Sequence, residues 1–412
     1  MSINKNYKCR NCNSKNVYNL INFNKVPLAN NLVISQKKKV AKFELELILC
    51  KKCWLVQTTK NINRNKIFNS DYPYLTATSS TANTNAFELY KYIKKNFDLH
   101  NKTLFELASN DGYFLENFLE TKNLKVIGVE PTLIPARISK SKGIKTIKNF
   151  FGINLAKSLK KKYKRADLIV ANNVIAHLSN IHDFVKGMKI LLNKNGTIII
   201  EFQNFIEMVN KNLIDNVYHE HYFYYSLTSI KNLLNKNGLK IYDAKKINVH
   251  GGSLRIFACH INDKIKISKN FKNMYRFELK KSKNMSFYIR FQKNFEILKK
   301  NISSFLKHNS NKKIVGFGAA AKASTFINLF NIHKYNLNRI IDNAQSKQGK
   351  YIAGTKIKVV HPKNIDLSKY EFLFIFAWNL KKEIIKFIKS YYNKRNIRIV
   401  TFIPKIKISK LK

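Results

Sequence analysis

Residues 102–130 read KTLFELASNDGYFLENFLETKNLKVIGVE, and this stretch decides the fold. Thr103–Leu107 is a short apolar β run, residues 108–112 have the composition of a turn, and residues 113–119 carry the apolar spacing of an amphipathic helix. Residues 124–130 form the next strand-like run, and Pro131 follows it. A strand, a turn, a helix and a second strand in this order predict a parallel sheet covered by helices.

The same alternation continues outward from this unit. Strand-like and helical patterns follow in turn at residues 154–162, 167–171, 181–192, 197–202 and 227–235. The series ends with two strand-like runs in succession, at residues 239–247 and 253–261. A terminal hairpin on a parallel sheet is more typical of class I methyltransferases than of dehydrogenases. The sequence therefore predicts an α/β, Rossmann-like core of the class I methyltransferase type.

The turn after the first strand separates two classes of cofactor. Dinucleotide-binding folds use Gly-x-Gly-x-x-Gly so that backbone can approach a pyrophosphate, whereas residues 106–112, ELASNDG, contain one glycine. That composition suits a cofactor without a pyrophosphate, such as S-adenosylmethionine, and a carboxylate at Glu130 can accept both ribose hydroxyls. A helix-capping Asp111 and a solvated Glu130 would explain the same residues. The candidate cofactor-binding residues are Glu106, Ala108, Asn110, Asp111, Gly112, Glu130, Pro131 and Asn172.

The composition limits the class of protein. A chain of 412 residues with 45% hydrophobic residues allows about two to four domains with a large core. The formal charge is +52, but the lysines run along the whole chain between asparagines and isoleucines, as an A/T-rich genome would produce. Such a surface still favours polyanions, including a nucleotide diphosphate. No apolar stretch reaches the roughly 20 residues that span a bilayer, and the N-terminus lacks an apolar signal core, so we expect a cytoplasmic protein.

Four of the five cysteines fall in two Cys-x-x-Cys pairs, Cys9 with Cys12 and Cys50 with Cys53. Two such pairs complete a four-thiolate zinc site, and a reducing cytoplasm disfavours disulfides. Four protein ligands leave no position for substrate, so the expected zinc ion is structural. Four unrelated thiols in a reducing cell are the alternative. Cys259 lies in a strand-like run and is given no function.

Titratable and aromatic residues are concentrated in residues 215–226, DNVYHEHYFYYS, at the carboxyl end of the predicted sheet. Open α/β folds bind their ligands at that edge. His219, Glu220 and His221 stand among five aromatic residues, and His177 approaches the same edge from the preceding strand. A neighbouring carboxylate can orient a histidine and raise its basicity. Structural packing between domains, or metal ligation by His219 and His221, are the alternatives.

Taken together, these residues resemble one family: the three-domain, S-adenosylmethionine-dependent C-methyltransferases that act on nucleotide-linked 4-keto-deoxysugars, typically dTDP-linked and typically at C3. The resemblance covers nearly the whole chain, and Tyr218-His-Glu-His221 and His250-Gly-Gly-Ser-Leu-Arg255 are its specific strings. The remaining matches are the four paired cysteines, Pro27-Leu-Ala-Asn30, Val56-Gln57, Asp71-Tyr-Pro-Tyr74, Ser109-Asn-Asp-Gly112, Ala171-Asn-Asn-Val-Ile-Ala-His177, Gly316-Phe-Gly-Ala-Ala-Ala-Lys322, Lys347-Gln-Gly-Lys350 and Gly354.

The resemblance implies roles for individual residues. His221 is the expected base, Glu220 orients or assists it, and Tyr218 and His177 hold the sugar or polarise its carbonyl, so these four are the candidate catalytic residues. The candidate substrate-binding residues are Tyr74, which would close the site, Asn173, His219, Tyr222, Arg255 and Lys322. Lys322 would meet phosphate near a helix N-terminus, although an exposed lysine on a capping turn explains it equally well.

The resemblance also implies three domains: a zinc-binding module at residues 1–75, a methyltransferase domain at residues 76–265, and a C-terminal domain at residues 266–412 that helps to enclose the nucleotide sugar. A basic linker bridges the last two. The C-terminal part itself indicates a second small Rossmann-like sheet, with strand-like runs at residues 313–318, 338–342, 371–378 and 397–403 and a helical run at residues 382–391. The chain departs from the family pattern at Ala321-Lys-Ala323 and at residues 213–217, which bears on turn flexibility and substrate fit.

Three other functions fit parts of the sequence. An O- or N-methyltransferase of the same fold needs no base for a C–H bond. A nucleic-acid methyltransferase would exploit the charge of +52, but the chain lacks an appended RNA-binding module and its aromatic residues cluster at the sheet edge. A zinc scaffold without activity is disfavoured by the intact Tyr-His-Glu-His string. We therefore expect a nucleotide-diphosphate keto-sugar as the partner, with neither nucleic acid nor membrane, and a monomer.

Overall fold

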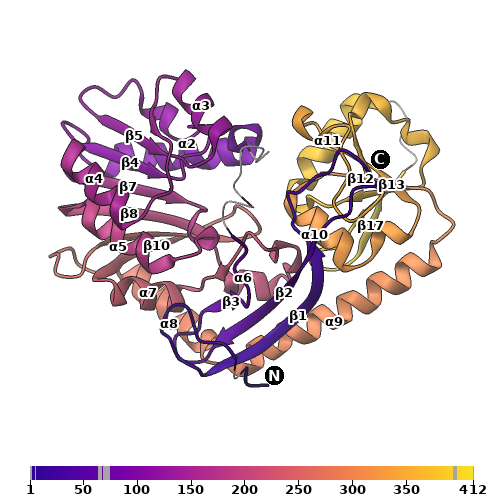
Figure 1. The fold of residues 1–412 in the computed structure, drawn as a ribbon, viewed down its shortest axis with the longest axis horizontal. Helices are drawn as coiled ribbons and strands as arrows, with labels where there is room; N and C mark the ends of the chain where they lie inside the picture. Colours follow the sequence, from indigo (N-terminus) through magenta and orange to yellow (C-terminus); the bar gives the residue numbers. More distant parts are fainter. Residues whose placement is uncertain (1, 5, 64–66, 68–74, 393–396, 412) are drawn as a thin grey trace.

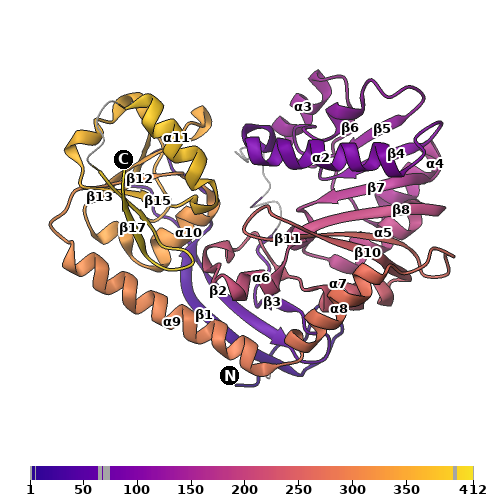
Figure 2. The same ribbon diagram turned by 180° about the vertical axis from the view of Figure 1, so that it is seen from behind.

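The computed structural model describes residues 2–4, 6–63, 67, 75–392 and 397–411. Two lobes stand on a base that is formed by two long N-terminal strands and one long helix (Figures 1 and 2). The predicted site residue Tyr74, with the rest of the Asp71-Tyr-Pro-Tyr74 string, lies outside the described residues. Within the described part of the chain, no helix has both the length and the apolar character that a membrane span requires.

The larger lobe is built on a seven-stranded sheet with the strand order β10-β11-β8-β7-β4-β5-β6. Six of these strands run in the same direction, and β11 runs antiparallel to both of its neighbours, β8 and β10. The predicted parallel sheet with its terminal hairpin is therefore confirmed. The strands are β4 (Thr103–Leu107), β5 (Lys125–Val129), β6 (Lys145–Ile147), β7 (Ala166–Asn172), β8 (Leu192–Gln203), β10 (Leu239–Ile247) and β11 (Ser253–His260).

Apolar residues alternate between the two faces of this sheet. Phe105 and Ile169 belong to the core on one face, whereas Leu104 and Leu168 belong to the core on the other. Both faces are buried because helices cover them, as parallel sheets require. The helices of this lobe are α2 (Ser80–Asn96), α3 (Leu133–Ser141), α4 (Ile153–Tyr163), α5 (Ile181–Leu191), α6 (Phe205–Asn210) and α7 (Leu227–Lys236).

One predicted helix is wrong. Residues 113–119 form only a 3-10 turn, Leu115–Phe118, in place of an amphipathic α-helix. The side chain of Asn117 donates to the backbone carbonyls of Tyr113 and Phe114, at 3.3 and 2.9 Å, and so occupies acceptors that an α-helix would use for its own amides. The backbone amide of Thr121 then pairs with the carbonyl of Phe118, three residues back, which continues the tighter turn.

A second, four-stranded antiparallel sheet lies across the base, in the order β1-β2-β3-β9. β1 (Val17–Pro27), β2 (Lys42–Cys50) and β3 (Val56–Thr58) come from the N-terminal segment. The fourth strand, β9 (Phe223–Tyr224), comes from the aromatic segment that follows Tyr218-His-Glu-His221. The N-terminal sheet is therefore completed by residues that lie beside the candidate catalytic string.

The smaller lobe contains a six-stranded sheet in the order β14-β13-β12-β15-β16-β17, of which only β17 is antiparallel. The prediction of a second Rossmann-like sheet is confirmed. The predicted linker consists of two helices, α8 and α9, which join the two lobes (Figure 2). The elements are α8 (Lys269–Ser282), α9 (Met285–His308), β12 (Ile314–Phe317), α10 (Ala321–Leu329), β13 (Leu337–Ile341), β14 (Lys358–Val360), β15 (Phe372–Ile375), α11 (Lys381–Tyr391), β16 (Arg398–Thr401) and β17 (Lys407–Lys410).

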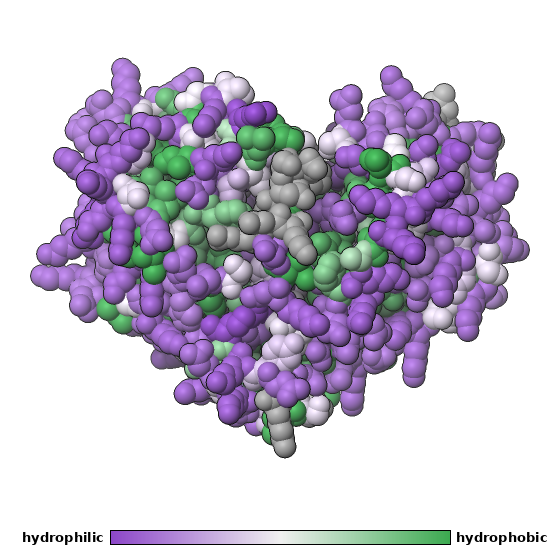
Figure 3. All heavy atoms as spheres, in the orientation of Figure 1, coloured by the Kyte–Doolittle hydropathy of each residue, from purple (hydrophilic) through white to green (hydrophobic). Residues whose placement is uncertain are grey.

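The three sheets are packed into one body. A single apolar cluster extends from β1 and β2 through α6 and α9 into the smaller lobe. Within it, the rings of Phe23 on β1 and Phe295 on α9 meet edge to face, with centroids 5.0 Å apart. Hydrophilic residues dominate the outside, while many hydrophobic residues lie towards the middle of the visible face (Figure 3). The domain boundaries at residues 75 and 265 stay predictions, since β9 belongs to the N-terminal sheet.

Candidate active site

The turn after β4 forms the first part of the candidate site. Ala108, Asn110 and Gly112 all have positive φ angles, of 57°, 49° and 77°, which fold the chain sharply at the carboxyl end of the sheet. A Cβ atom on Gly112 would lie 2.5 Å from Cδ1 of Ile144 and 2.8 Å from Oγ of Ser139. Glycine is therefore required here both for its φ angle and for close packing of the turn.

Glu130, at the end of β5, holds this turn in place. Its Oε2 atom accepts a hydrogen bond from the backbone amide of Asn110 at 2.9 Å. Its Oε1 atom accepts from the backbone amide of Thr132 at 2.8 Å. Pro131, which lies between Glu130 and Thr132 in the sequence, is half-buried. Glu130 is thus 4% exposed rather than solvated. Oε1 also accepts from the hydroxyl of Thr132, so Oε2, with one bond, is the oxygen that has capacity for a ligand hydroxyl.

Several buried acceptors around this turn have no hydrogen-bond partner among the described residues. Glu106 accepts from the side chain of Asn172 at 3.2 Å through Oε1, but its Oε2 atom is unpaired. Ser109 Oγ, Asp111 Oδ1 and Asn172 Oδ1 are also unpaired. Burial raises the pKa of Glu106 well above its ordinary value and also raises the pKa of Asp111. These unpaired atoms fit a ligand that carries N–H and O–H donors and positive charge, which S-adenosylmethionine does.

His221 and Tyr218 form the second part of the site. The Nδ1 atom of His221 lies 2.9 Å from the backbone carbonyl oxygen of Asn216. Because a carbonyl only accepts, Nδ1 carries the proton and Nε2 holds the free lone pair. The hydroxyl of Tyr218 lies 2.9 Å from Nε2 and donates to it. Burial lowers the pKa of His221 well below its ordinary value, so the ring is neutral at neutral pH.

His177 faces His221 from the neighbouring strand. It ends the 3-10 turn Ile175–His177 that follows β7, and the two ring centroids lie 4.7 Å apart with the planes at 70°. Burial lowers the pKa of His177 to about 4, against a hydrogen bond to the backbone of Glu220 that raises it. Asn172, at the end of the same strand, contacts Glu106. β7 thus connects the turn after β4, through Asn172, with the two neutral histidines, His177 and His221.

Glu220 is held by a residue that the sequence-based site did not include. The side-chain amide of Asn30 donates to both carboxylate oxygens of Glu220, at 2.7 and 2.9 Å. Asn30 lies in the loop between β1 and β2, and Glu220 is 3% exposed. Asn30 stands within the Pro27-Leu-Ala-Asn30 string of the resemblance, which is the one sequence signal that pointed to it. The N-terminal sheet therefore fixes the orientation of a candidate catalytic carboxylate.

His219 and Tyr222 point away from the histidine pair and into the N-terminal sheet. The Nε2 atom of His219 lies 3.1 Å from the carbonyl oxygen of Phe43 on β2, and donates to it. The hydroxyl of Tyr222 donates to the carbonyl of Ile62 at 2.6 Å. Both side chains are buried, at 3% and 0% exposed. Their observed contacts anchor the candidate catalytic segment, residues 218–222, to the N-terminal module.

Arg255 lies in a buried network beside the site. Its Nε atom pairs with Glu201 Oε1 at 2.5 Å, and its Nη2 atom donates to Asn85 on α2 at 3.1 Å. Asn85 also donates to Glu201 at 2.8 Å, so the charges of the pair are well satisfied. Asn173, with a positive φ of 52°, donates from its backbone amide to the carbonyl of Glu201 at 2.9 Å. The network links the strands that carry the site.

Lys322 lies at the contact between the two lobes rather than facing open solvent. Its Nζ atom is 3.5 Å from Asp215 Oδ2, and it also donates to Asn379. The indole of Trp378 donates to the same Asp215 oxygen at 2.7 Å. Asp215 and Trp378 were not among the predicted site residues. The predicted strand at residues 371–378 ends at Ile375, which frees Trp378 to turn towards the larger lobe.

The four paired cysteines meet at one point, as predicted. The sulfur atoms of Cys9, Cys12, Cys50 and Cys53 all lie within 4.8 Å of one another, with two pairs at 3.5 Å. Tetrahedral zinc with bonds of about 2.3 Å to sulfur places neighbouring sulfurs roughly 3.8 Å apart. Hydrogen bonds from neighbouring thiols lower the pKa of Cys12 to about 7. The donor set and its spacing therefore fit a structural zinc ion that is held by these four residues.

A chain of hydrogen bonds leads from the cysteines to the catalytic segment. The side chain of Gln57 donates to Cys9 Sγ at 3.2 Å and accepts from the backbone and Nε atoms of Arg10, both at 3.1 Å. The Nη2 atom of Arg10 then donates to the backbone carbonyl of Tyr222 at 3.1 Å. Tyr222 directly follows His221. The metal-binding module thus supports the segment that carries the candidate base.

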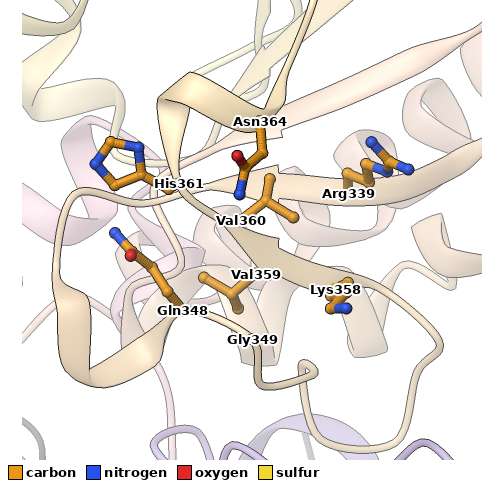
Figure 4. Close-up of a pocket in the computed structure, with 8 residues that line it drawn as sticks. All are labelled: Arg339, Gln348, Gly349, Lys358, Val359, Val360, His361 and Asn364. Carbon is orange, nitrogen blue, oxygen red and sulfur yellow. The ribbon is translucent and has the colours of Figure 1, made fainter.

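A groove of about 300 Å³ lies on the smaller lobe, along β14 (Figure 4). It is lined by Arg339, Gln348, Gly349, Lys358, Val359, Val360, His361 and Asn364. Its two permanent cations, Arg339 and Lys358, are exposed. None of the predicted site residues lines it, so we assign no part of the chemistry to this groove.

Comparisons with known proteins cover most of the chain. Three family models match: a zinc binding domain at residues 9–68, a methyltransferase domain at residues 83–244, and a C-methyltransferase C-terminal domain at residues 248–404. The C-methyltransferase NovU from Streptomyces niveus is 25% identical over 386 residues, which are 92% of this chain and 91% of NovU.

Two solved structures align with part of the chain. The magnesium protoporphyrin IX methyltransferase ChlM from Synechocystis PCC 6803 is 10% identical with a TM-score of 0.34, over 43% of this chain and 79% of that one. The PH0226 protein from Pyrococcus horikoshii OT3 is 13% identical with a TM-score of 0.37, over 49% of this chain and all of that one. At these TM-scores neither likeness bears on the assignment. The three family matches, their order along the chain and the alignment with NovU over 92% of the chain show that the protein is a methyltransferase, with matches to a zinc binding domain near its N-terminus and to a C-methyltransferase C-terminal domain after the methyltransferase domain.

Proposed function

We propose that the protein transfers a methyl group from S-adenosylmethionine to C3 of a nucleotide-linked 4-keto-deoxysugar, through an enolate. The observation that carries this proposal is the pair of neutral histidines, His177 and His221, with ring centroids 4.7 Å apart next to the cofactor turn. Removing a proton from carbon requires a base, and a C–H bond beside a ketone is acidic because its anion delocalises onto oxygen. The name of the relative NovU, a C-methyltransferase, supports a carbon acceptor.

In the proposed mechanism His221 takes the C3 proton at Nε2, the atom that its bond to Asn216 leaves unprotonated. Tyr218 now donates to Nε2, so its hydroxyl turns to the sugar O4 and stabilises the developing negative charge there. The C3–H electron pair moves into the C3–C4 bond of the enolate. Its carbon would then take the methyl group as the S–CH3 bond breaks, and the cofactor sulfur would leave as a neutral thioether. The proton on His221 leaves to solvent after the product departs. A positioned base of this kind contributes about 10²–10⁴-fold to the rate.

Other residues hold the reactants in the proposal. S-adenosylmethionine supplies an electrophilic methyl group on a sulfonium, and Glu106, Asn110, Asp111, Glu130 and Asn172 offer the acceptors that bind it. Glu220 assists His221, and Asn30 keeps its carboxylate oriented. His177 and Asn173 face the sugar from the end of β7, and Tyr74 closes the site. His219, Tyr222 and Arg255 act through packing, given their buried structural partners.

The test is to incubate the protein with S-adenosylmethionine labelled in its methyl group and a panel of nucleotide-linked 4-keto-sugars. Mass spectrometry detects a gain of one methyl group, and NMR of the product locates it. A new carbon–carbon bond at C3 is the expected result. A methyl group on oxygen or nitrogen would overturn the carbon acceptor, and transfer to RNA or DNA but to none of the sugars would overturn the substrate class.

A further inference from the structure

A buried carboxylate joins the smaller lobe to the turn that orients His221. Asp215 is 4% exposed and lies in the 3-10 turn Ile214–Asn216 of the larger lobe. Its Oδ2 atom accepts from Trp378 Nε1 at 2.7 Å and faces Lys322 Nζ at 3.5 Å. Both donors belong to the smaller lobe. The next residue, Asn216, supplies the carbonyl that accepts from His221 Nδ1.

We propose that Asp215 is a positioning residue, which couples the seating of the smaller lobe to the tautomer and orientation of His221. The inference rests on the proposed function in one respect, that His221 takes the proton. A buried carboxylate needs donors, because leaving one unpaired carries a large desolvation penalty. When the smaller lobe is seated, Trp378 and Lys322 pair with Oδ2 of Asp215 and the turn stays closed, while Oδ1 is buried without a partner among the described residues. When it is not seated, Asp215 must turn towards water, and the carbonyl of Asn216 moves with it.

The packing around this contact leaves little freedom. The cavity that Asp215, Lys322 and Trp378 line has a volume of only about 10 Å³, room for one water molecule at most. A Cβ atom on Gly251 would lie 2.9 Å from Cη2 of Trp378 and 2.7 Å from Cδ1 of Leu213, so the indole is tightly enclosed. A phosphate group cannot reach Lys322 while this contact is closed. Lys322 therefore serves Asp215 in the closed state rather than a diphosphate.

A second contact between the same lobes provides a matched control. Glu383, at the start of α11, accepts hydrogen bonds from Ser80 and Thr81 on α2, at 2.9 and 2.8 Å. That contact is exposed, and the structure connects it to neither Asn216 nor His221. If lobe contacts in general were what mattered, Glu383→Gln would act like Asp215→Asn. If Asp215 acts through His221, only Asp215→Asn affects the chemistry.

The experiment compares Asp215→Asn, Trp378→Phe and Glu383→Gln with the unmodified protein. For Asp215→Asn we expect kcat for methyl transfer to fall roughly tenfold to a hundredfold. We expect KM for the nucleotide sugar to change little, and the acidic limb of the kcat–pH profile to shift. Trp378→Phe keeps an aromatic ring and removes one donor, so it should show a smaller loss of the same kind and covers the case in which Asp215→Asn fails to fold. Glu383→Gln should leave all three quantities unchanged. A rise in KM with kcat unchanged would overturn the proposal, because it would make Asp215 and Lys322 part of the substrate site.

A second measurement needs no turnover and separates this inference from the proposed function. Nitrogen-15 NMR of the histidines reports which ring nitrogen of His221 is protonated, and His221→Asn identifies its signals. We expect the Nδ1-protonated tautomer in the unmodified protein and in Glu383→Gln, and a mixture of tautomers in Asp215→Asn and Trp378→Phe. If Asp215→Asn and Trp378→Phe both kept the Nδ1-protonated tautomer, the coupling would be contradicted even if no sugar substrate were ever found.

Discussion

Asn30 donates hydrogen bonds to both carboxylate oxygens of Glu220, at 2.7 and 2.9 Å, across 190 residues of sequence. The asparagine lies in the loop that leaves β1, and the glutamate lies between the two histidines of the Tyr-His-Glu-His string. Such bonds fix the direction of the carboxylate. The N-terminal module therefore contributes to the candidate active site itself, in addition to carrying the cysteine cluster.

Replacing Asn30 by Ala should lower kcat while leaving the fold intact. The loss of bonds to an ionised group corresponds to about 1.5–3 kcal/mol, or roughly a tenfold to hundredfold lower rate. Steady-state kinetics on the nucleotide sugar would measure the effect. Asn31→Ala is the matched control, because Asn31 is the exposed neighbour in the same loop. Equal rates for the two variants would show that Asn30 does not act on Glu220.

Glu106→Gln should weaken binding of S-adenosylmethionine. Oε2 of Glu106 is buried and has no partner among the described residues, so it is available to a positively charged or N–H donor of the ligand. Glutamine replaces one acceptor oxygen by an NH2 group, which cannot accept, and the loss of that bond predicts about a tenfold higher Kd, which isothermal titration calorimetry would measure. Glu116→Gln, in the next turn and paired with Lys142 near the surface, serves as control. Tighter binding by Glu106→Gln would place the cofactor elsewhere.

Cys12→Ser should remove the zinc ion and with it most of the methyl transfer activity. The path from Cys9 through Gln57 and Arg10 to Tyr222 lies directly beside His221, and β9 is part of the N-terminal sheet. Metal content by plasma mass spectrometry and activity should therefore fall together. Cys259→Ser, in β11 and outside the cluster, should retain one zinc ion per chain. A zinc-free protein with full activity would contradict the supporting role.

Stability should fall as the pH drops from neutral, because His177 is buried in its neutral form. Burial lowers its folded-state pKa to about 4, against an unfolded value of about 6.5. Above pH 6.5 both states are neutral and the folded state keeps its full stability. Between about pH 6.5 and 4 the unfolded chain binds the extra proton, so the free energy of unfolding declines. Denaturant titrations across this range should show a shallower decline for His177→Asn, and parallel curves would show that His177 titrates normally.

Much of the fold could be predicted from local patterns. β4 and β10 match their predicted bounds, and the terminal hairpin is an antiparallel pair, because apolar alternation and chain order determine these features. The cysteine spacing likewise predicted the four-sulfur cluster. The helix at residues 113–119 failed because a side chain, Asn117, competes for backbone carbonyls, and helical periodicity does not register that competition.

The contacts that complete the site depend on the tertiary fold. Nothing local in the sequence indicates that Asn30 reaches Glu220, that β9 joins the N-terminal sheet, or that Trp378 reaches Asp215. His219 and Tyr222 have the residue types of a site but turn towards Phe43 and Ile62. The backbone turns at Tyr218-His-Glu-His221, where the amide of His221 donates to the carbonyl of Tyr218. Neighbouring side chains therefore reach different partners, and composition alone does not separate the candidate catalytic residues from the anchoring ones.

In the proposed mechanism, His221 removes a proton from C3 before the methyl group is transferred. Incubating a nucleotide-linked 4-keto-deoxysugar with the protein in deuterated water, without S-adenosylmethionine, tests this step, with deuterium at C3 followed by mass spectrometry and NMR. We expect exchange catalysed by the unmodified protein and a loss of about 10²–10⁴-fold in His221→Asn. Methyl transfer without any exchange, or exchange that persists at full rate in His221→Asn, would contradict it.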